Sequence, residues 1–403
     1  MIVLHFLSWI LLAAEICIAL PIAYLCILSI SALIATRKRD KHKHDEFEDS
    51  AQTNFAILIP AHNEEMILSK LLESLSQLEY PQELYTIYVV ADNCTDTTAS
   101  LARQFDRVCV YERFNEKERG KGYALNWIWQ QLAGRQHDAY VVLDADSVVV
   151  PTFLSAMDRE LAHGALALQA CNTVLNVTES PSTALRWIAL TLMNHVRPLG
   201  RNGIGGSSTL TGNGMCLSRT ILARYPWKAF GIAEDYQYYL TLVQNGERVR
   251  YVPEAIVRSQ MPVTFAQMRT QDVRWEAAEP QQSSRRTALQ LLKVGLSTGS
   301  FVRIEAMLEL LTPPLSFMVV SCSFAFLASL LLRSPLEIGL GIALLVGLAG
   351  YIATALYLLR APRAVYKALL HAPGFILWKL WVYFVLSRSR KHTDEWIRTA
   401  RTS

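Results

Sequence analysis

Long apolar segments at both ends of the chain constrain its fold more than any other feature. Hydrophobic residues make up 51% of the sequence, and they concentrate in residues 2–35 and 306–386. A membrane-spanning helix needs about 20 such residues in a row. The region between the two segments has the composition of a soluble domain. The sequence therefore predicts a membrane protein with a globular middle region.

The first segment predicts a single transmembrane helix. A secretory signal peptide is the competing interpretation, but the apolar run is too long and no basic region precedes it. Glu15 is costly in lipid, so we expect it either to face another helix or to be protonated. Basic residues cluster at positions 37–43, which places this flank in the cytosol by the positive-inside rule. We assign residues 1–36 to the helix and 37–53 to a basic and polar linker.

The C-terminal part returns to the membrane. Residues 286–307 mix apolar and charged side chains, which is typical of an interfacial helix. Residues 308–359 hold two apolar segments and predict a transmembrane hairpin. Residues 360–403 predict an amphipathic membrane-surface segment and a basic tail, with a fourth span as the alternative. Three spans place the middle region on the cytosolic side of the inner membrane.

The middle region, residues 54–285, alternates short buried strands with helices. The strands are predicted at 55–60, 84–90, 108–111 and 140–143. This rhythm predicts an α/β domain with a parallel, doubly wound sheet, in which ligands bind at the carboxyl ends of the strands. Three polar clusters follow strand ends: His62–Glu65, Asp92–Thr98 and Asp144–Ser147.

The segment Asp144-Ala-Asp146 ends the last of these strands. Residues two apart in extended chain point to the same face, so both carboxylates converge on one spot. Such a spot suits Mg²⁺ or Mn²⁺ shared with phosphate oxygens. A capped strand end or a turn is the simpler alternative for this motif taken alone.

The charge and the cysteine content argue against a nucleic-acid-binding protein and against a disulfide-bonded middle region. The net charge of +4 gives no case for nucleic-acid binding. The seven cysteines form no C-x-x-C pair, which favours reduced thiols and a cytosolic middle region.

Six motifs occur in a fixed order along residues 54–280. They are Ile57-Leu-Ile-Pro-Ala-His-Asn-Glu-Glu65, Ala91-Asp-Asn-Cys-Thr-Asp96, Arg119-Gly-Lys-Gly122, Asp144-Ala-Asp146, Glu234-Asp235 and Gln271-x-x-Arg274-Trp275. This ordered set resembles glycosyltransferase family 2, membrane-bound inverting enzymes with a Rossmann-like GT-A fold. It is similar to the branch that holds cellulose, chitin and hyaluronan synthases and ceramide glucosyltransferase.

The resemblance implies a role for each motif residue. Nucleotide-sugar binding would fall to Pro60, Glu64, Asp92, Lys121, Asp144, Gln271 and Arg274. Asp146, with Asp144, would hold the metal, and Asp235 would be the general base. Glu234 and Trp275 would lie at the acceptor. The simpler alternatives are helix caps for Asp92 and the Glu234–Asp235 pair, a solvated charge for Lys121 and a core position for Trp275.

The expected activity is inverting, metal-dependent sugar transfer, with Mg²⁺ or Mn²⁺, from a nucleotide-sugar such as a UDP-sugar. The acceptor would be a lipid-linked saccharide or an exopolysaccharide, and the partners would be membrane lipids and polysaccharide export proteins. A processive polysaccharide synthase that translocates its product is one alternative. A catalytically inactive nucleotide-binding subunit of a secretion complex is another. Asn213 departs from the small hydroxyl residue of the processive synthases, which leaves the acceptor open.

Overall fold

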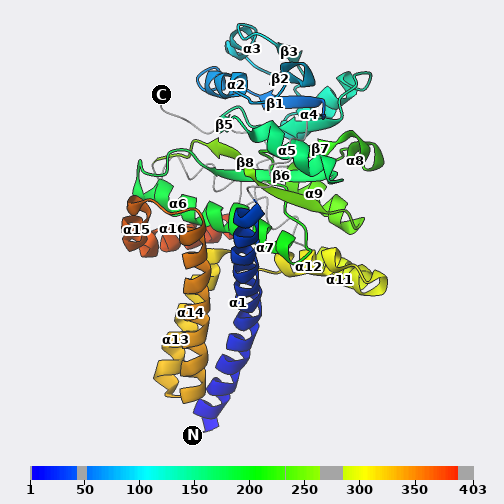
Figure 1. Cartoon of the computed structure of the whole chain (residues 1–403). Helices are drawn as coiled ribbons and strands as arrows, with labels where there is room; N and C mark the ends of the chain where they lie inside the picture. Colours follow the sequence, from blue (N-terminus) through cyan, green and yellow to red (C-terminus); the bar gives the residue numbers. More distant parts are fainter. Residues whose placement is uncertain (1, 43–51, 232, 264–284, 389–403) are drawn as a thin grey trace.

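The computed structural model describes residues 2–42, 52–231, 233–263 and 285–388. Within these ranges three helices are long and apolar enough to cross a membrane, at Phe6–Lys41, Leu315–Leu332 and Pro335–Leu358. They belong to α1 (Ile2–His42), α13 (Leu315–Leu332) and α14 (Pro335–Leu358). The three run side by side below an α/β domain, as the sequence predicts (Figure 1).

The described part of the α/β domain contains one mixed sheet of eight strands in the order β3-β2-β1-β4-β7-β6-β8-β5. The strands are β1 (Phe55–Ala61), β2 (Tyr85–Asp92), β3 (Val108–Arg113), β4 (Ala139–Val142), β5 (Ser147–Val149), β6 (Ala167–Val174), β7 (Met215–Ser218) and β8 (Val249–Ser259). The first four are parallel, but β7 runs antiparallel to β4 and β6, and β5 runs antiparallel to β8. The prediction of a parallel sheet is therefore wrong for β7 and β5, whereas β6 and β8 pair parallel to each other. Apolar runs mark strand positions, but they do not encode the direction in which a strand enters the sheet.

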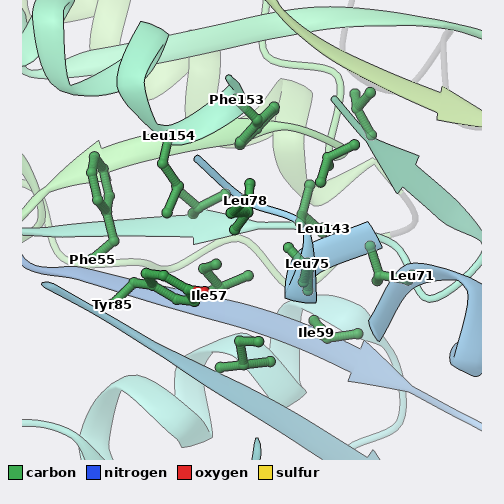
Figure 2. Close-up of a cluster of buried hydrophobic side chains, with 14 of the residues drawn as sticks. Phe55, Ile57, Ile59, Leu71, Leu75, Leu78, Tyr85, Leu143, Phe153 and Leu154 are labelled. Atoms are coloured by element: carbon green, nitrogen blue, oxygen red, sulfur yellow. The ribbon is translucent and has the colours of Figure 1, made fainter. Parts of the chain in front are cut away.

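Alternate residues of β1 face opposite sides of the sheet and so belong to two cores. Phe55, Ile57 and Ile59 pack with α2 (Leu68–Ser76) and α5 (Phe153–Ala162), as Figure 2 shows. Ala56 and Leu58 pack on the other face with α4 (Lys121–Gln131) and α9 (Glu234–Gln244). The remaining short helices of the domain are α3 (Thr98–Ala102) and α8 (Arg219–Arg224).

A third core joins the α/β domain to the three candidate membrane helices. A continuous helical segment, made of α6 (Pro181–Thr191), a π-helical turn (Leu192–Val196) and α7 (Arg197–Gly203), lies across the top of α1. Leu28 of α1 packs with Leu199 of α7, and Ser31 Oγ donates to the carbonyl of Gly200 at 2.9 Å. Further helices C-terminal to the α/β domain are α11 (Arg285–Thr298), α12 (Phe301–Leu310), α15 (Arg363–Ala368) and α16 (Ala372–Arg388).

Several predicted boundaries shift. Helix α1 continues through the basic block to His42, where Arg39 forms an ion pair with Glu254 of β8, so this block is helical rather than linker. The interfacial helix is broken in two at Gly299, whose φ is +64°. The prolines at 313–314 delay the next span to Leu315, because proline donates no backbone hydrogen bond. A loop, residues 204–214, follows α7 and leads to β7.

Candidate active site

The three predicted polar clusters meet at one edge of the sheet because β2, β1 and β4 are parallel neighbours. Asn63 and Asn93 follow β1 and β2 with φ of +56° and +50°, a conformation that asparagine tolerates better than most residues. Asn63 Oδ1 accepts the backbone N–H of Thr95 at 2.8 Å. The N–H of Glu64 donates to Thr98 Oγ1 at 2.8 Å. These contacts join the turns after β1 and β2, beside buried Pro60 of β1, into one rigid rim.

Asp92 is the most enclosed of the predicted donor-binding residues, with 1% of its surface exposed. Arg113 Nη1 donates to its Oδ1 at 2.7 Å, while Oδ2 is buried without a hydrogen bond among the described residues. Burial raises the pKa of the Asp92 carboxyl, and Arg113 opposes that shift. Arg113 is not among the residues predicted from the sequence. It ends β3 in register with Asp92, so a cation at the end of the strand after Asp92 is the signal that indicates it.

Lys121, the first residue of α4, points across the sheet edge. Its Nζ donates to Asp144 Oδ1 at 2.5 Å and to the carbonyl of Gly212 at 2.7 Å. Burial opposes the charge on Lys121, but Asp144 and Glu234 outweigh burial, so the pKa of Lys121 lies above its ordinary value. An ammonium group that is fixed in this way is suited to binding a diphosphate.

Asp144 and Asp146 lie in the turn between β4 and β5 rather than in extended strand. The side chain of Asp144 is 40% exposed, and Asp146 is partly exposed. Across the described residues no three His, Cys, Asp or Glu side chains cluster as a ready metal cage. The two carboxylates fit a hard divalent cation that takes its remaining ligands from phosphate oxygens and water.

Glu234 and Asp235 form the first turn of α9. A Cβ built on Gly212 would lie 2.9 Å from Asp235 Oδ2 and 3.2 Å from Lys121 Nζ, so this glycine lies directly against both charges. Burial, followed by the neighbouring Asp235, raises the pKa of Glu234 to about 8. Burial also raises the pKa of Asp235, against the influence of Lys121. Asp235 is therefore a stronger base than an ordinary aspartate.

Asn213 stands where the processive synthases have a small hydroxyl residue. Its side chain joins the loop before β7 to the Asp144 turn. Its Nδ2 donates to Ser147 Oγ and Ser259 Oγ at 2.8 and 3.0 Å, and its Oδ1 accepts the N–H of Asp144 at 3.2 Å. A fully bonded, buried amide fixes the loop, and Gly212 with it, against the sheet edge. The predicted residues Gln271, Arg274 and Trp275 lie outside the described residues.

Comparison with known proteins matches the residues of this domain to a protein family. A family model described as glycosyltransferase-like family 2 matches residues 52–278, more than half of the 403-residue chain. The chain belongs to this family. Family 2 enzymes are glycosyltransferases, and the matched region contains every one of the predicted site residues. In fold, the chain is similar to a mannosyltransferase from Pyrobaculum calidifontis solved with GDP-Man and Mn²⁺, with TM-score 0.50, 15% identity and coverage of 93% of this chain and 99% of that one.

The curated relatives have names that describe different sugar-transfer enzymes. A beta-monoglucosyldiacylglycerol synthase of Nostoc sp. is 31% identical over 204 residues, covering 49% of this chain and 42% of the relative. An N-acetylglucosaminyltransferase of Rhizobium leguminosarum bv. viciae is 25% identical over 254 residues, covering 57% and 56%. The chain thus spans about half the length of the curated relatives it matches.

Proposed function

We propose that the protein is a membrane-bound, inverting glycosyltransferase that moves a sugar from a UDP-linked donor to a hydroxyl of a lipid acceptor, either a diacylglycerol-type lipid or a lipid-linked saccharide. The convergence of Lys121, Gly212 and Asp235 beside the Asp144 turn carries this proposal. It sets a cation suited to a leaving diphosphate next to a carboxylate that can accept a proton. The similarity to a diacylglycerol glucosyltransferase supports the lipid acceptor.

In this mechanism Asp235 takes the proton of the acceptor hydroxyl while the oxygen attacks the anomeric carbon from the face opposite the diphosphate. A single displacement inverts the configuration at that carbon. The raised pKa of Asp235 favours proton uptake. Lys121 stabilises the charge that develops on the diphosphate. A divalent cation, when bound through Asp146 and Asp144, would supply further charge neutralisation there.

The donor base would be read by Asp92. Its buried Oδ2, which has no hydrogen-bond partner among the described residues, is an acceptor for a ring N–H. Uracil carries an N–H at position 3, whereas cytosine has an acceptor there, so the pocket favours UDP over CDP. Pro60 and Glu64 would line the same pocket. Gln271, Arg274 and Trp275 are proposed, from the family resemblance, to cover the diphosphate and the acceptor.

The lipid acceptor would enter from the inner membrane along the interfacial helices. Helix α11 exposes Leu289 and Leu296 next to Lys293, a pattern suited to the boundary between acyl chains and headgroups. Residues 54–285 would form the cytosolic catalytic domain, with 286–307 and 360–403 on the membrane surface. The cellulose, chitin and hyaluronan synthase branch stays a rival, although three candidate spans in the described chain would make a narrow polymer channel.

The decisive experiment is a donor and acceptor screen on purified protein in lipid nanodiscs. UDP-glucose, UDP-galactose, UDP-N-acetylglucosamine and GDP-mannose are each supplied with Mn²⁺ and with diacylglycerol or a lipid-linked saccharide. We expect one UDP-sugar to give a glycolipid bearing a single sugar of inverted configuration. A ladder of products would instead establish a processive synthase. UDP binding without transfer from any donor would establish an inactive nucleotide-binding subunit.

A further inference from the structure

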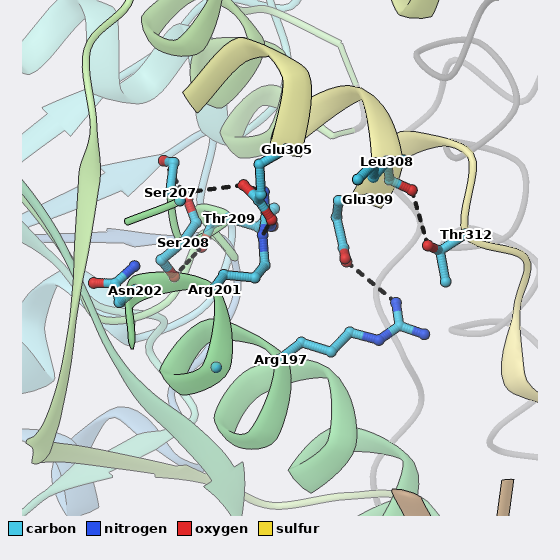
Figure 3. A network of polar contacts seen from close by, with 12 residues as sticks. Arg197, Arg201, Asn202, Ser207, Ser208, Thr209, Glu305, Leu308, Glu309 and Thr312 are labelled. Carbon is cyan, nitrogen blue, oxygen red and sulfur yellow. Dashed lines mark hydrogen bonds and ion pairs between the residues drawn. The ribbon is translucent and has the colours of Figure 1, made fainter. Parts of the chain in front are cut away.

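A buried ion pair joins α7 to α12 (Figure 3). Arg201 of α7 donates through Nε and Nη2 to both oxygens of Glu305 of α12, at 2.5 and 3.0 Å. The two side chains are 1% and 0% exposed. Tyr24 of α1 donates to Glu305 Oε1 at 2.6 Å. One carboxylate therefore ties a membrane helix, an interfacial helix and the catalytic domain together.

The ion pair also holds the loop that carries Gly212. The N–H of Ser207 donates to Glu305 Oε2 at 3.3 Å, and Arg201 Nη1 donates to Thr209 Oγ1 at 2.8 Å. A Cβ built on Gly206 would lie 2.6 Å from the Glu305 carboxyl carbon, so the loop backbone packs directly on this carboxylate. The same loop continues from Gly206 to Gly212, and Gly212 lies against Asp235.

Arg201 contacts the helix of the proposed base as well. Its Nη2 donates to Tyr239 Oη at 2.8 Å. Tyr239 lies four residues after Asp235 on α9, one helical turn along the same face. The guanidinium of Arg201 thus bonds to both elements that bring Gly212 and Asp235 together.

We propose that Arg201 and Glu305 are positioning residues that hold Gly212 and Asp235 in reactive geometry while α1 and α12 are packed on the catalytic domain. This inference rests on the proposed function. A buried ion pair adds little net stability, because desolvation offsets the attraction. A two-pronged guanidinium–carboxylate contact does fix distance and orientation. Docking of the membrane helices then becomes a condition for turnover.

A second ion pair on the same helices provides a matched control. Arg197 of α7 donates to Glu309 of α12 at 3.2 Å and to Tyr351 of α14 at 2.8 Å. Tyr24 also donates to Glu309, at 3.3 Å. This pair joins the same two residue types and is 11% and 13% exposed, and its hydrogen bonds run to α1, α12 and α14 rather than to the loop or α9.

The test compares two double variants in nanodiscs, Arg201→Met/Glu305→Leu and Arg197→Met/Glu309→Leu. Removing both charges together avoids an uncompensated buried ion, so both variants should fold. We expect kcat of the first to fall about 10- to 100-fold, the loss typical of a misplaced reacting group. Its donor KM should stay within about threefold, since the lost contacts act on the reaction step. The second variant should keep both kcat and donor KM within about threefold of the wild-type values.

Amide hydrogen exchange supplies a readout that needs no turnover. In the first variant the amides of Ser207–Gly212 and the start of α9 should exchange faster than in the second. Equal kcat in the two variants, or a rise confined to donor KM, would overturn the inference. If wild-type protein transfers no sugar, the proposed function fails, and exchange alone decides whether this pair orders the loop. Unchanged exchange would then reject the positioning role.

Discussion

Arg113 bonds to one oxygen of Asp92, at 2.7 Å, and leaves the other oxygen buried and without a hydrogen bond among the described residues. The two residues are register partners at the ends of β3 and β2, so the sheet itself sets this geometry. Burial raises the pKa of the Asp92 carboxyl and the Arg113 guanidinium opposes that rise, while Oδ2 is left as an unused hydrogen-bond acceptor among the described residues.

We predict that Asp92→Asn lowers the preference for UDP over CDP about 10- to 100-fold, as expected for one lost hydrogen bond to a charged group. The ratio of the two affinities, measured by calorimetry, isolates base recognition, because any disturbance of Arg113 affects both nucleotides. Glu118→Gln is the control. Glu118 also pairs with Arg113, at 3.3 Å, but is 55% exposed, so its loss should leave the ratio unchanged. An unchanged ratio in Asp92→Asn would remove Asp92 from base recognition.

Sugar transfer should require a divalent metal ion, and the amount of metal required should depend on Asp146. We expect excess chelator to abolish sugar transfer and Mn²⁺ or Mg²⁺ to restore it. Asp146→Asn should need about tenfold more metal for half-maximal rate, because a neutral amide oxygen is a weaker ligand for a hard cation. Metal titrations of transfer rate measure this, with exposed Asp106→Asn as the control. Full activity in chelator would contradict the prediction.

Asp235→Asn should reduce kcat by about 10²–10⁴-fold, the usual effect of removing a general base. Glu234→Gln should keep most activity, because a carboxyl with a pKa of about 8 is already mostly neutral at pH 7. UDP affinity should be nearly normal in both variants. The opposite pattern, an active Asp235→Asn and a dead Glu234→Gln, would make Glu234 the base.

The same carboxylate sets a pH dependence. Burial raises the pKa of Asp235, so the group takes up its proton at a higher pH than an ordinary aspartate. As pH falls, kcat should therefore drop at a pH above about 3.9, the ordinary value for aspartate. A pH–rate profile at saturating donor checks this. A profile that stays flat to pH 4 would show that no such group must be ionised.

Gly122→Ala should destabilise the catalytic domain, because the added Cβ would overlap the carbonyl oxygen of Ala229. Ala229 precedes the segment that leads to Asp235, and Lys121 adjoins the glycine, so transfer should fall as well. Gly134→Ala offers a matched control, since a Cβ there meets nothing within 4 Å. Thermal unfolding of the two variants in nanodiscs compares them, and equal midpoints would refute the packing argument.

Apolar patterning and motif order determined much of this protein from sequence alone. A strand buried on both faces must be apolar throughout, so β1, β2 and β4 are recognisable without the fold. Long apolar runs likewise indicate membrane helices whatever lies between them. Asp92, Asp144 and Asp235 follow strand ends or start a helix, where local sequence already restricts the backbone.

The tertiary structure decided which of these groups meet. The reversed strand β7 and the loop before it bring Gly212 to Lys121, which is 91 residues earlier in the chain. Arg201 and Glu305 are 104 residues apart, and each is an ordinary charged residue in its own segment. A charge becomes buried and paired through the packing of distant elements, which no local pattern records. The sequence thus specified the chemical groups of the site, and the packing of distant elements specified which of them meet.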